Sequence, residues 1–277
     1  MNSGKTVLIT GCSSGIGLMA ACRLHALNYE VIASARNPDD VVMLRSLGLR
    51  AVCLDTSNLS SVDQGLDEAL TMAGGRFYAV FHNAGYGQSG ALEDLPAQAL
   101  VDQFMTNVVG AHHINHRLIP LMRKAGEGRI IFNSSVLGLV AMRYRGAYTA
   151  SKFAVEAIAD TLRLELASSG IKVVLLEPGP IATDFRKNSL AAFERHVTPE
   201  RSVHSEPYKA FLARLGMTGN TSRFTLPPDA CMRPLLESLE SSDPKARYPI
   251  TRPARLMAVF KRVLPTRMLD KIVFKGI

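Results

Sequence analysis

Residues 6–17 read TVLITGCSSGIG, a short apolar run that passes directly into a glycine-rich turn. The apolar run predicts a buried strand at 6–10, and the residues after the turn predict a helix over 15–27. Glycines in such a turn let a pyrophosphate approach the backbone N–H groups at the start of the helix. A turn that binds no ligand is the alternative, but its position between strand and helix favours a dinucleotide site. The candidate cofactor contacts here are Gly11, Ser13, Ser14, Gly15, Ile16 and Gly17.

The rest of the chain alternates short β-rich apolar runs with longer segments of helical periodicity. Runs such as RIIFNS and KVVLLE are nearly continuous in apolar residues, which is typical of strands covered on both faces. This alternation predicts an α/β fold: one Rossmann-like domain over residues 1–250, built on a doubly wound parallel sheet. The further expected strands are 30–35, 50–54, 77–82, 128–134, 171–177 and 246–250, and the further expected helices are 39–46, 58–73, 97–124, 148–169 and 228–241.

Residues 184–227 interrupt the alternation. The segment is polar, contains Pro199, Pro207 and Pro227, and shows one convincing helix, near 206–215. An insertion of this size beside strand ends is usually functional, so we expect a substrate loop or lid.

The basic character of the chain is concentrated in residues 251–277, which we treat as a C-terminal extension. Seven lysines and arginines face the single acid Asp270 there, so this extension carries +6 of the formal net charge of +8. The near-neutral remainder argues against a nucleic-acid partner. Apolar residues recur at helical spacing between the basic ones. The extension therefore either contacts an anionic membrane surface reversibly or packs on the protein or a subunit interface.

The sequence shows no targeting segment and no metal-binding pattern. No apolar run approaches the roughly 18 residues of a membrane span, and no signal peptide precedes the first strand, so we expect a cytoplasmic protein. Peripheral contact with the inner face of a membrane is the alternative. The cysteines lack metal-ligand spacing, and we interpret His112, His113 and His116 as packing residues.

The residues after the second and third strands bear on the cofactor. The second strand ends in Arg36, where an NAD-specific site normally has an acid, and a guanidinium there could pair with a 2′-phosphate. A surface arginine paired with Asp39 or Asp40 is the alternative; we favour NADP(H). Asp55 could accept the adenine amino group or act as a turn residue.

Asn83, Ala84 and Gly85 follow the fourth strand. Small residues at this place let the backbone lie close to the adenosine side of a cofactor.

Tyr148 and Lys152 are four positions apart, which places them on one helix face, about 6 Å apart along the axis. A free tyrosine has a pKa near 10, so it is a poor base at neutral pH. A nearby ammonium and the positive nicotinamide ring both favour phenolate, and lowering the pKa by about three units takes roughly 4 kcal/mol. An exposed Tyr–Lys pair is common on helices, so the spacing alone leaves the role open.

Together these motifs resemble the short-chain dehydrogenase/reductase family, over residues 5–250. The matching residues are TGCSSGIG at 10–17, NAG at 83–85, Asn107, Ser135, YTASK at 148–152 and PGPIAT at 178–183. Their order and separations also fit. The resemblance implies a nicotinamide cofactor and assembly as a homodimer or homotetramer.

The resemblance also implies a catalytic tetrad of Asn107, Ser135, Tyr148 and Lys152. In it Ser135 orients the substrate oxygen, Tyr148 exchanges its proton with that oxygen, and Lys152 also holds the nicotinamide ribose. Asn107 keeps a helix carbonyl free for a water relay. Spacing selects Ser135 over Ser134.

After the strand at 171–177 the implied cofactor contacts are Pro178, Gly179, Ile181 and Thr183. Ile181 and Thr183 contact the nicotinamide, and Thr183 binds its carboxamide.

Within the family, CSSGIG, the SAR after the second strand and EPGPIATDF resemble the NADP(H)-preferring branch of hydroxysteroid and retinol dehydrogenases and bacterial aldehyde reductases. We expect NADPH-dependent reduction of a lipophilic aldehyde or ketone, because the expected pocket lining is apolar. We interpret Arg143 and Arg145 as solvated charges rather than as binders of an acidic substrate. The alternatives are oxidation of a sterol or retinol-like alcohol and, from a different class, a non-catalytic NADP(H) sensor. The expected lining is Tyr86, Leu137, Leu139, Val140, Met142 and Phe185.

Overall fold

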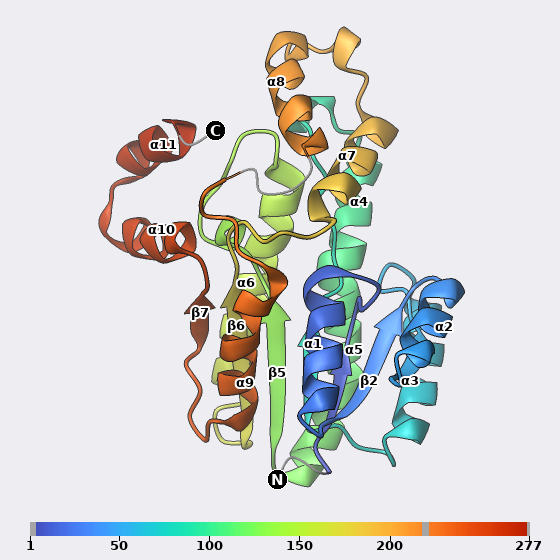
Figure 1. Cartoon of the computed structure of the whole chain (residues 1–277). Helices are drawn as coiled ribbons and strands as arrows, with labels where there is room; N and C mark the ends of the chain where they lie inside the picture. The colour runs from blue at the N-terminus through green and yellow to red at the C-terminus, as the bar shows by residue number, and fades with distance from the viewer. Residues whose placement is uncertain (1–3, 218–221, 276–277) are drawn as a thin grey trace.

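Seven parallel strands form the centre of the computed structural model, which describes residues 4–217 and 222–275. Their order across the sheet is β3-β2-β1-β4-β5-β6-β7, and each neighbouring pair is parallel (Figure 1). The order runs outward in both directions from β1 and β4, so the doubly wound sheet expected from the sequence is confirmed. The strands are β1 (Thr6–Ile9), β2 (Glu30–Ala35), β3 (Arg50–Cys53), β4 (Ala79–His82), β5 (Gly128–Asn133), β6 (Ile171–Glu177) and β7 (Arg247–Pro249).

Helices cover both faces of this sheet. Successive strand residues point to opposite faces: Val7 and Ile9 pack with the first set of helices, and Leu8 packs with the second. All three are fully buried, which explains why the strands are apolar without alternation. The first set is α1 (Gly15–Ala26), α2 (Pro38–Ser46) and α9 (Met232–Glu240); the second is α3 (Leu59–Met72), α5 (Gly110–Ala125) and α6 (Gly146–Glu165).

The long helix expected over 97–124 is interrupted. The chain forms α4 (Ala97–Phe104), a π-helical turn at Met105–Val109, and then α5. The wider turn displaces a carbonyl from the regular i to i+4 pattern, and such single π turns are frequent at functional sites. The interruption escapes a periodicity argument because the chain resumes an α-helix directly after it.

The described residues of 184–227, which leave out 218–221, contain two helices rather than the single helix expected. They are α7 (Phe185–His196) and α8 (Ser205–Gly216), and both lie beyond the carboxyl ends of the strands (Figure 1). α7 was missed because it is polar: its buried residues are Ser189, Ala192 and Phe193. Phe193 packs with Tyr208 of α8 in a small core of its own. Short helical turns lie at Leu92–Asp94, Val136–Gly138, Pro199–Arg201 and Pro228–Cys231.

The C-terminal extension forms two further helices, α10 (Arg252–Val263) and α11 (Thr266–Lys275). Met257 and Phe260 of α10 and Leu269 of α11 pack with Leu137 and Val140, so the extension lies against the body of the protein. None of the described helices is long and apolar enough to cross a membrane.

Arg247 of β7 joins three carboxylates from two other elements. It donates to Glu156 and Asp160 of α6, the latter at 2.6 Å, and to Glu177 of β6 at 2.7 Å. The side chain of Glu177 is 1% exposed and that of Glu156 is 8% exposed. Burial raises the pKa of Glu177 to about 7, and the charge of Glu156 acts in the same direction. The guanidinium is therefore the counter-charge that lets these carboxylates be buried together.

We predict that Arg247→Leu lowers the free energy of unfolding by about 3–5 kcal/mol, because it leaves buried carboxylates without their counter-charge. Urea unfolding followed by circular dichroism, at a pH where Glu177 is ionised, measures the change. Arg233→Leu is the matched control, since its pair with Glu237 lies on the exposed side of α9, and we expect a cost below about 1 kcal/mol. A similarly small cost for Arg247→Leu would contradict the role given to this residue.

Candidate active site

The glycine turn after β1 packs directly against the loop that follows β4. Asn83 Nδ2 donates to the carbonyl oxygens of Thr10 (3.1 Å) and Gly11 (2.9 Å), and Thr10 Oγ1 accepts from the N–H groups of Asn83 and Ala84. Gly11 has a φ of +70°, and a Cβ there would lie 2.7 Å from Ala84 Cα. A Cβ on Gly17 would collide with the Gly11 carbonyl. Both positions therefore require glycine, and the turn keeps its backbone uncovered.

The start of α1 offers uncapped N–H groups. Ser14 precedes the helix in an extended conformation, and its side chain makes no cap hydrogen bond. First-turn N–H groups and the helix dipole favour an anion such as a phosphate. A Cβ on Gly15 would lie 3.0 Å from Thr183 Cγ2, so the same turn borders the loop after β6.

Arg36 and Asp55 follow the neighbouring strands β2 and β3. Arg36 is exposed, and within residues 4–217 and 222–275 no ion pair joins it to Asp39 or Asp40. Asp55 Oδ1 accepts from the N–H and the hydroxyl of Ser57, at 2.9 and 2.8 Å. Asp55 is thus a turn residue, as one of the two interpretations of the sequence had it. The structure leaves the guanidinium of Arg36 available to an anion.

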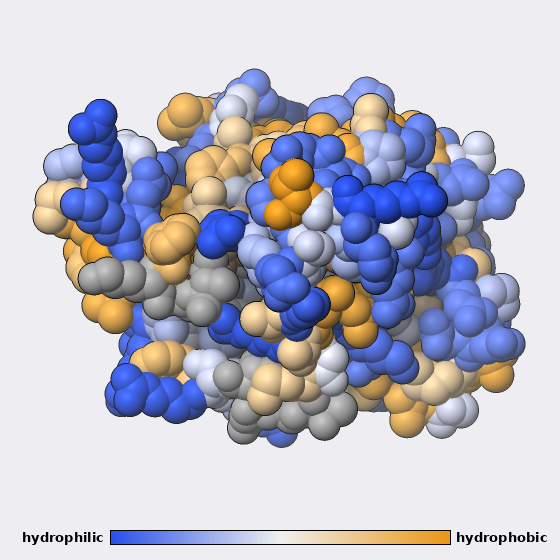
Figure 2. Space-filling view, turned by 90° about the horizontal axis from the view of Figure 1, so that it is seen from above, coloured by the Kyte–Doolittle hydropathy of each residue, from blue (hydrophilic) through white to orange (hydrophobic). Residues whose placement is uncertain are grey.

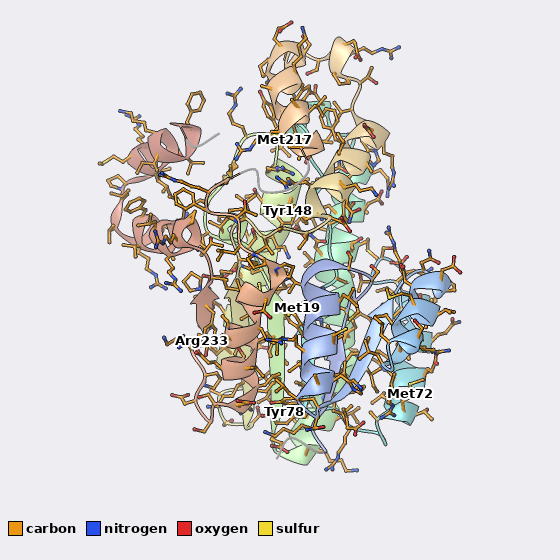
Figure 3. All side chains as sticks on the ribbon, viewed as in Figure 1. Met19, Met72, Tyr78, Tyr148, Met217 and Arg233 are labelled. Carbon is orange, nitrogen blue, oxygen red and sulfur yellow. The ribbon has the colours of Figure 1, made fainter. Side chains whose placement is uncertain are left out.

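A cavity of about 570 Å³ lies where the strands end. Figure 3 shows Tyr148 at this edge of the sheet, below α8. Leu137, Met142 and Phe185 line the cavity as expected, whereas Tyr86, Leu139 and Val140 are not among the lining residues. The candidate site residues that line it are Ile16, Asn83, Gly85, Ser135, Tyr148, Lys152, Pro178, Gly179, Ile181 and Thr183.

The two serines after β5 have different partners. Ser134 Oγ donates to the buried carboxylate of Glu156, so this hydroxyl is already engaged. Ser135 Oγ accepts from the N–H of Leu137 at 3.1 Å and also lies close enough to Tyr148 to stabilise its phenolate by a hydrogen bond. The geometry thus puts Ser135 rather than Ser134 beside the phenol.

Lys152 is connected to the glycine turn through two asparagines. Its Nζ donates to the main-chain oxygen of Asn133 at 2.6 Å, and Asn133 Nδ2 donates to Asn83 Oδ1 at 2.9 Å. Asn83 in turn bonds to Thr10 and Gly11. The lysine and the cofactor turn are therefore held by one hydrogen-bond chain across β1, β4 and β5.

Asn107 lies behind the cavity wall rather than on it. It belongs to the π-helical turn, where its Oδ1 accepts from Tyr86 N at 3.1 Å and its Nδ2 donates to Tyr86 O and to Ser151 Oγ. These bonds fix the loop after β4 to α6. The π turn and the side-chain bonds together are compatible with a freed carbonyl near Lys152.

Burial dominates the electrostatics of the two central groups. It raises the pKa of Tyr148 to about 12, against the opposing effects of the Ser135 hydroxyl and the Arg145 charge. It lowers the pKa of Lys152 to about 8. The sequence argument looked to the lysine for the charge that favours phenolate. Its Nζ lies 5.7 Å from the centroid of the Tyr148 ring, and Arg145 is a further cation whose charge lowers the pKa of the phenol. At neutral pH Tyr148 is therefore protonated and able to donate.

Arg145 corrects an expectation. Its Nη1 donates to Ser89 Oγ at 2.7 Å, and its guanidinium carbon lies 5.1 Å from the centroid of the Phe211 ring. It is thus a cavity residue and not the solvated charge expected from the sequence. Nothing in the local sequence signals this, because Ser89 and Phe211 are far from it along the chain. Arg143 fits the expectation better, since it is exposed and stacks on Tyr144 at 5.0 Å.

One histidine of α5, His113, has an ordinary structural partner, whereas His112 and His116 are exposed rather than packed as expected. His113 Nε2 lies 2.9 Å from Asp63 of α3, a carboxylate that also pairs with Arg117 at 2.7 Å. Within the described part of the chain, no group of three or more His, Cys, Asp or Glu side chains is arranged to hold a metal ion.

Comparison with known proteins identifies the family of the chain. The family model described as short chain dehydrogenase matches residues 5–193. The chain is 42% identical over 269 residues to the uncharacterized oxidoreductase YbbO of Escherichia coli K12, a match that covers 97% of this chain and 94% of that protein. It is 30% identical over 285 residues to the NADPH-dependent 3-dehydrocapnine reductase of Ornithobacterium rhinotracheale, with 99% and 97% coverage.

A solved structure is similar over nearly the whole fold. The short chain dehydrogenase/reductase from Burkholderia phymatum, in complex with NAD, superimposes with a TM-score of 0.79 at 26% identity and covers 98% of this chain and 95% of its own. Since the family model spans more than half of the chain and the relatives match almost all of it, the chain belongs to the short-chain dehydrogenase/reductase family and is an oxidoreductase acting on CH–OH or carbonyl groups.

Proposed function

We propose that this protein reduces a lipophilic aldehyde or ketone with NADPH. The observation that carries the proposal is the position of Ser135, Tyr148 and Lys152 on the wall of one cavity that Ile16 of the glycine turn also lines. The raised pKa of Tyr148 supports the reductive direction, because a protonated phenol is ready to donate. Leu137, Phe185 and their apolar neighbours support a lipophilic substrate.

The residues present fit a nicotinamide dinucleotide. A Cβ on Gly11 or Gly17 would collide with neighbouring protein atoms, so both glycines keep the turn tight, and the first-turn N–H groups of α1 have no side-chain cap. Ile181 and Thr183 line the cavity, and we assign them to the nicotinamide ring and its carboxamide. When bound, this cofactor supplies the hydride that reaches the carbonyl carbon.

The chain's own residues then orient and protonate the oxygen of the substrate. Ser135 Oγ donates a hydrogen bond to that oxygen, and Tyr148 Oη transfers its proton to it, so that the carbonyl becomes a hydroxyl. The Lys152 ammonium also binds the nicotinamide ribose, and together with Arg145 it stabilises the phenolate left behind. The main-chain carbonyl freed beside Asn107 binds the first water of a relay, and this relay returns the proton to Tyr148.

The preference for NADPH rests on Arg36. Its guanidinium follows β2, where the ribose 2′ position lies in this kind of fold, and it can form a charge-assisted contact with a 2′-phosphate. The Ornithobacterium relative, named as NADPH-dependent, supports this assignment, while the Burkholderia structure holds NAD. We place the adenine beside Asp55, which keeps its second carboxylate oxygen for the amino group.

We also propose that the protein assembles as a homodimer or homotetramer through α4 and α6. Leu100 and Val101 of α4 and Phe153 and Leu164 of α6 are exposed, and the two helices contact each other. Exposed large apolar side chains on adjoining helices favour burial against a second copy.

The C-terminal extension retains an apolar surface that can contact a membrane. Leu256, Val259 and Val263 of α10 are 53%, 55% and 65% exposed, although the other side of the helix packs on the protein. Seen from above, hydrophilic and apolar residues lie side by side over the extension, at the left of Figure 2. We propose that this surface binds anionic lipid at the cytoplasmic face of a membrane.

Tyr148→Phe should lower kcat with alkyl and aryl aldehydes by about 10²–10⁴-fold, because the general acid is lost. Binding of NADPH, followed by its fluorescence, should change little. Tyr29→Phe is the matched control, since its hydroxyl bonds to Glu240, away from the cavity. Activity of the native protein on polyols and none on alkyl or aryl aldehydes would exclude the proposed substrate class.

Arg36→Leu should lower the ratio of kcat/KM with NADPH to kcat/KM with NADH by about 10- to 100-fold, the value of one charged hydrogen bond. NADH serves as the internal control, because it lacks the 2′-phosphate. An unchanged ratio would show that Arg36 does not recognise the cofactor.

The double variant Val259→Glu, Val263→Glu should lose co-sedimentation with vesicles that contain anionic lipid, while the native protein sediments with them. Both side chains point away from the packed side of α10, so folding should be retained. Val42→Glu, at an exposed apolar position of α2, is the control. Equal partitioning of all three proteins would end the membrane proposal.

A further inference from the structure

The cavity has a strongly cationic wall. In the part of the chain that the structure describes, no Asp or Glu side chain lines it, although five basic residues do. Lys152 belongs to the catalytic group already described. Of the others, Arg145 favours the Tyr148 phenolate, while Arg143, Arg186 and Arg214 have no part in the proposed chemistry of a neutral aldehyde.

Arg145 is the most deeply placed of these arginines. Burial lowers its pKa to about 10, so the guanidinium is desolvated yet still charged at neutral pH. Its recorded contacts are the Ser89 hydroxyl and the face of Phe211, both without charge. A guanidinium has five N–H donors, and a desolvated cation is costly unless it is paired with an anion. Within the described residues no carboxylate provides that pairing.

Arg214 brings a second positive charge to the same place. It lies on α8, one turn after Phe211, and its charge acts against that of Arg145. No ion pair of Arg214 occurs among the described residues. Two like charges in one cavity repel each other, and an anion between them would convert the repulsion into attraction.

This charge lies on the substrate side of the site. Arg145 directly precedes α6, three residues before Tyr148, and Arg214 belongs to the α7–α8 layer beyond the strand ends (Figure 1). The glycine turn, by contrast, follows β1, and Arg36 follows β2, so the cofactor phosphates have their own partners. The anion that fits between Arg145 and Arg214 therefore belongs to the substrate.

We propose that the substrate is an amphipathic carbonyl compound with an acidic head group, held between Arg145 and Arg214, and an apolar chain against Leu137, Met142 and Phe185. The inference rests on the proposed reductase function, whose substrate class it narrows. Because Arg145 and Tyr148 are one helical turn apart, the acidic group stands only a few atoms from the carbonyl.

The test compares γ-oxodecanoate with its methyl ester, in which an added methyl group removes the charge of the head group and leaves the apolar chain unchanged. The native protein should show a kcat/KM with NADPH at least about tenfold higher for the acid, the value of a charge-assisted hydrogen bond. Arg214→Gln and Arg145→Gln should each reduce this acid-to-ester ratio by about tenfold or more. If Arg145 acted only through Tyr148, its variant would lower both rates and leave the ratio unchanged.

Arg233→Gln is the matched control. This arginine lies on α9, well away from Tyr148 in Figure 3, and its side chain is 89% exposed. Its acid-to-ester ratio should equal that of the native protein. A native ratio near one, or a ratio that neither cavity variant alters, would overturn the proposal.

Calorimetric titration of γ-oxodecanoate into the protein saturated with NADP⁺ separates this inference from the proposed function. Binding that weakens in the Arg145 and Arg214 variants supports the anion site whether or not the compound is turned over. Turnover of simple alkyl aldehydes without any binding of the acid would retain the reductase and refute the anion site.

Discussion

The site depends on the tight contact between the turn after β1 and the loop after β4. These strands are where the sheet order reverses, so their connecting segments diverge and leave space beyond the strand ends. Asn83 holds the two segments together because its Nδ2 donates to the carbonyls of Thr10 and Gly11. Its Oδ1 accepts from the side chain of Asn133, whose main-chain oxygen accepts from Lys152. One polar chain thus sets the position of the cofactor cradle relative to the catalytic lysine. Since each member of this chain is wholly or partly buried, removal of any one hydrogen bond would leave a polar group unpaired.

Desolvation controls the chemistry of the site more than the pairing of Tyr148 with Lys152 does. The phenol becomes harder to ionise and the ammonium easier to deprotonate, so both shift toward the neutral form. The Ser135 hydroxyl and the Arg145 charge oppose the pKa shift of Tyr148, and the charge of Glu156 opposes that of Lys152. When the bound cofactor carries a positive nicotinamide ring, that charge lowers the pKa of Tyr148 beyond what the protein's own residues do.

Much of the fold could be predicted from sequence because its signals are local. Strands buried on both faces are continuous apolar runs, and the glycine turn needs its residues at fixed positions, as the contacts of Gly11 and Gly17 show. α7 could not be predicted, since its stability comes from packing Phe193 on Tyr208 rather than from an apolar stripe. The environment of Arg145 was hidden for the same reason: Ser89 and Phe211 reach it only in the folded chain. Ser135 and Tyr148 were identifiable through the family resemblance, whereas the place of Asn107 behind the wall required the structure.

The packing of α10 and α11 has a practical consequence for handling the protein. Their apolar residues contact Leu137 and Val140, which share a cluster with Tyr148, so this part of the chain forms the back of the catalytic wall. The N-terminal end of β1 lies at the opposite edge of the sheet (Figure 1). An affinity tag or a reporter fusion placed after α11 would therefore sit beside the reaction centre, whereas one placed before β1 would be separated from it by the length of the sheet.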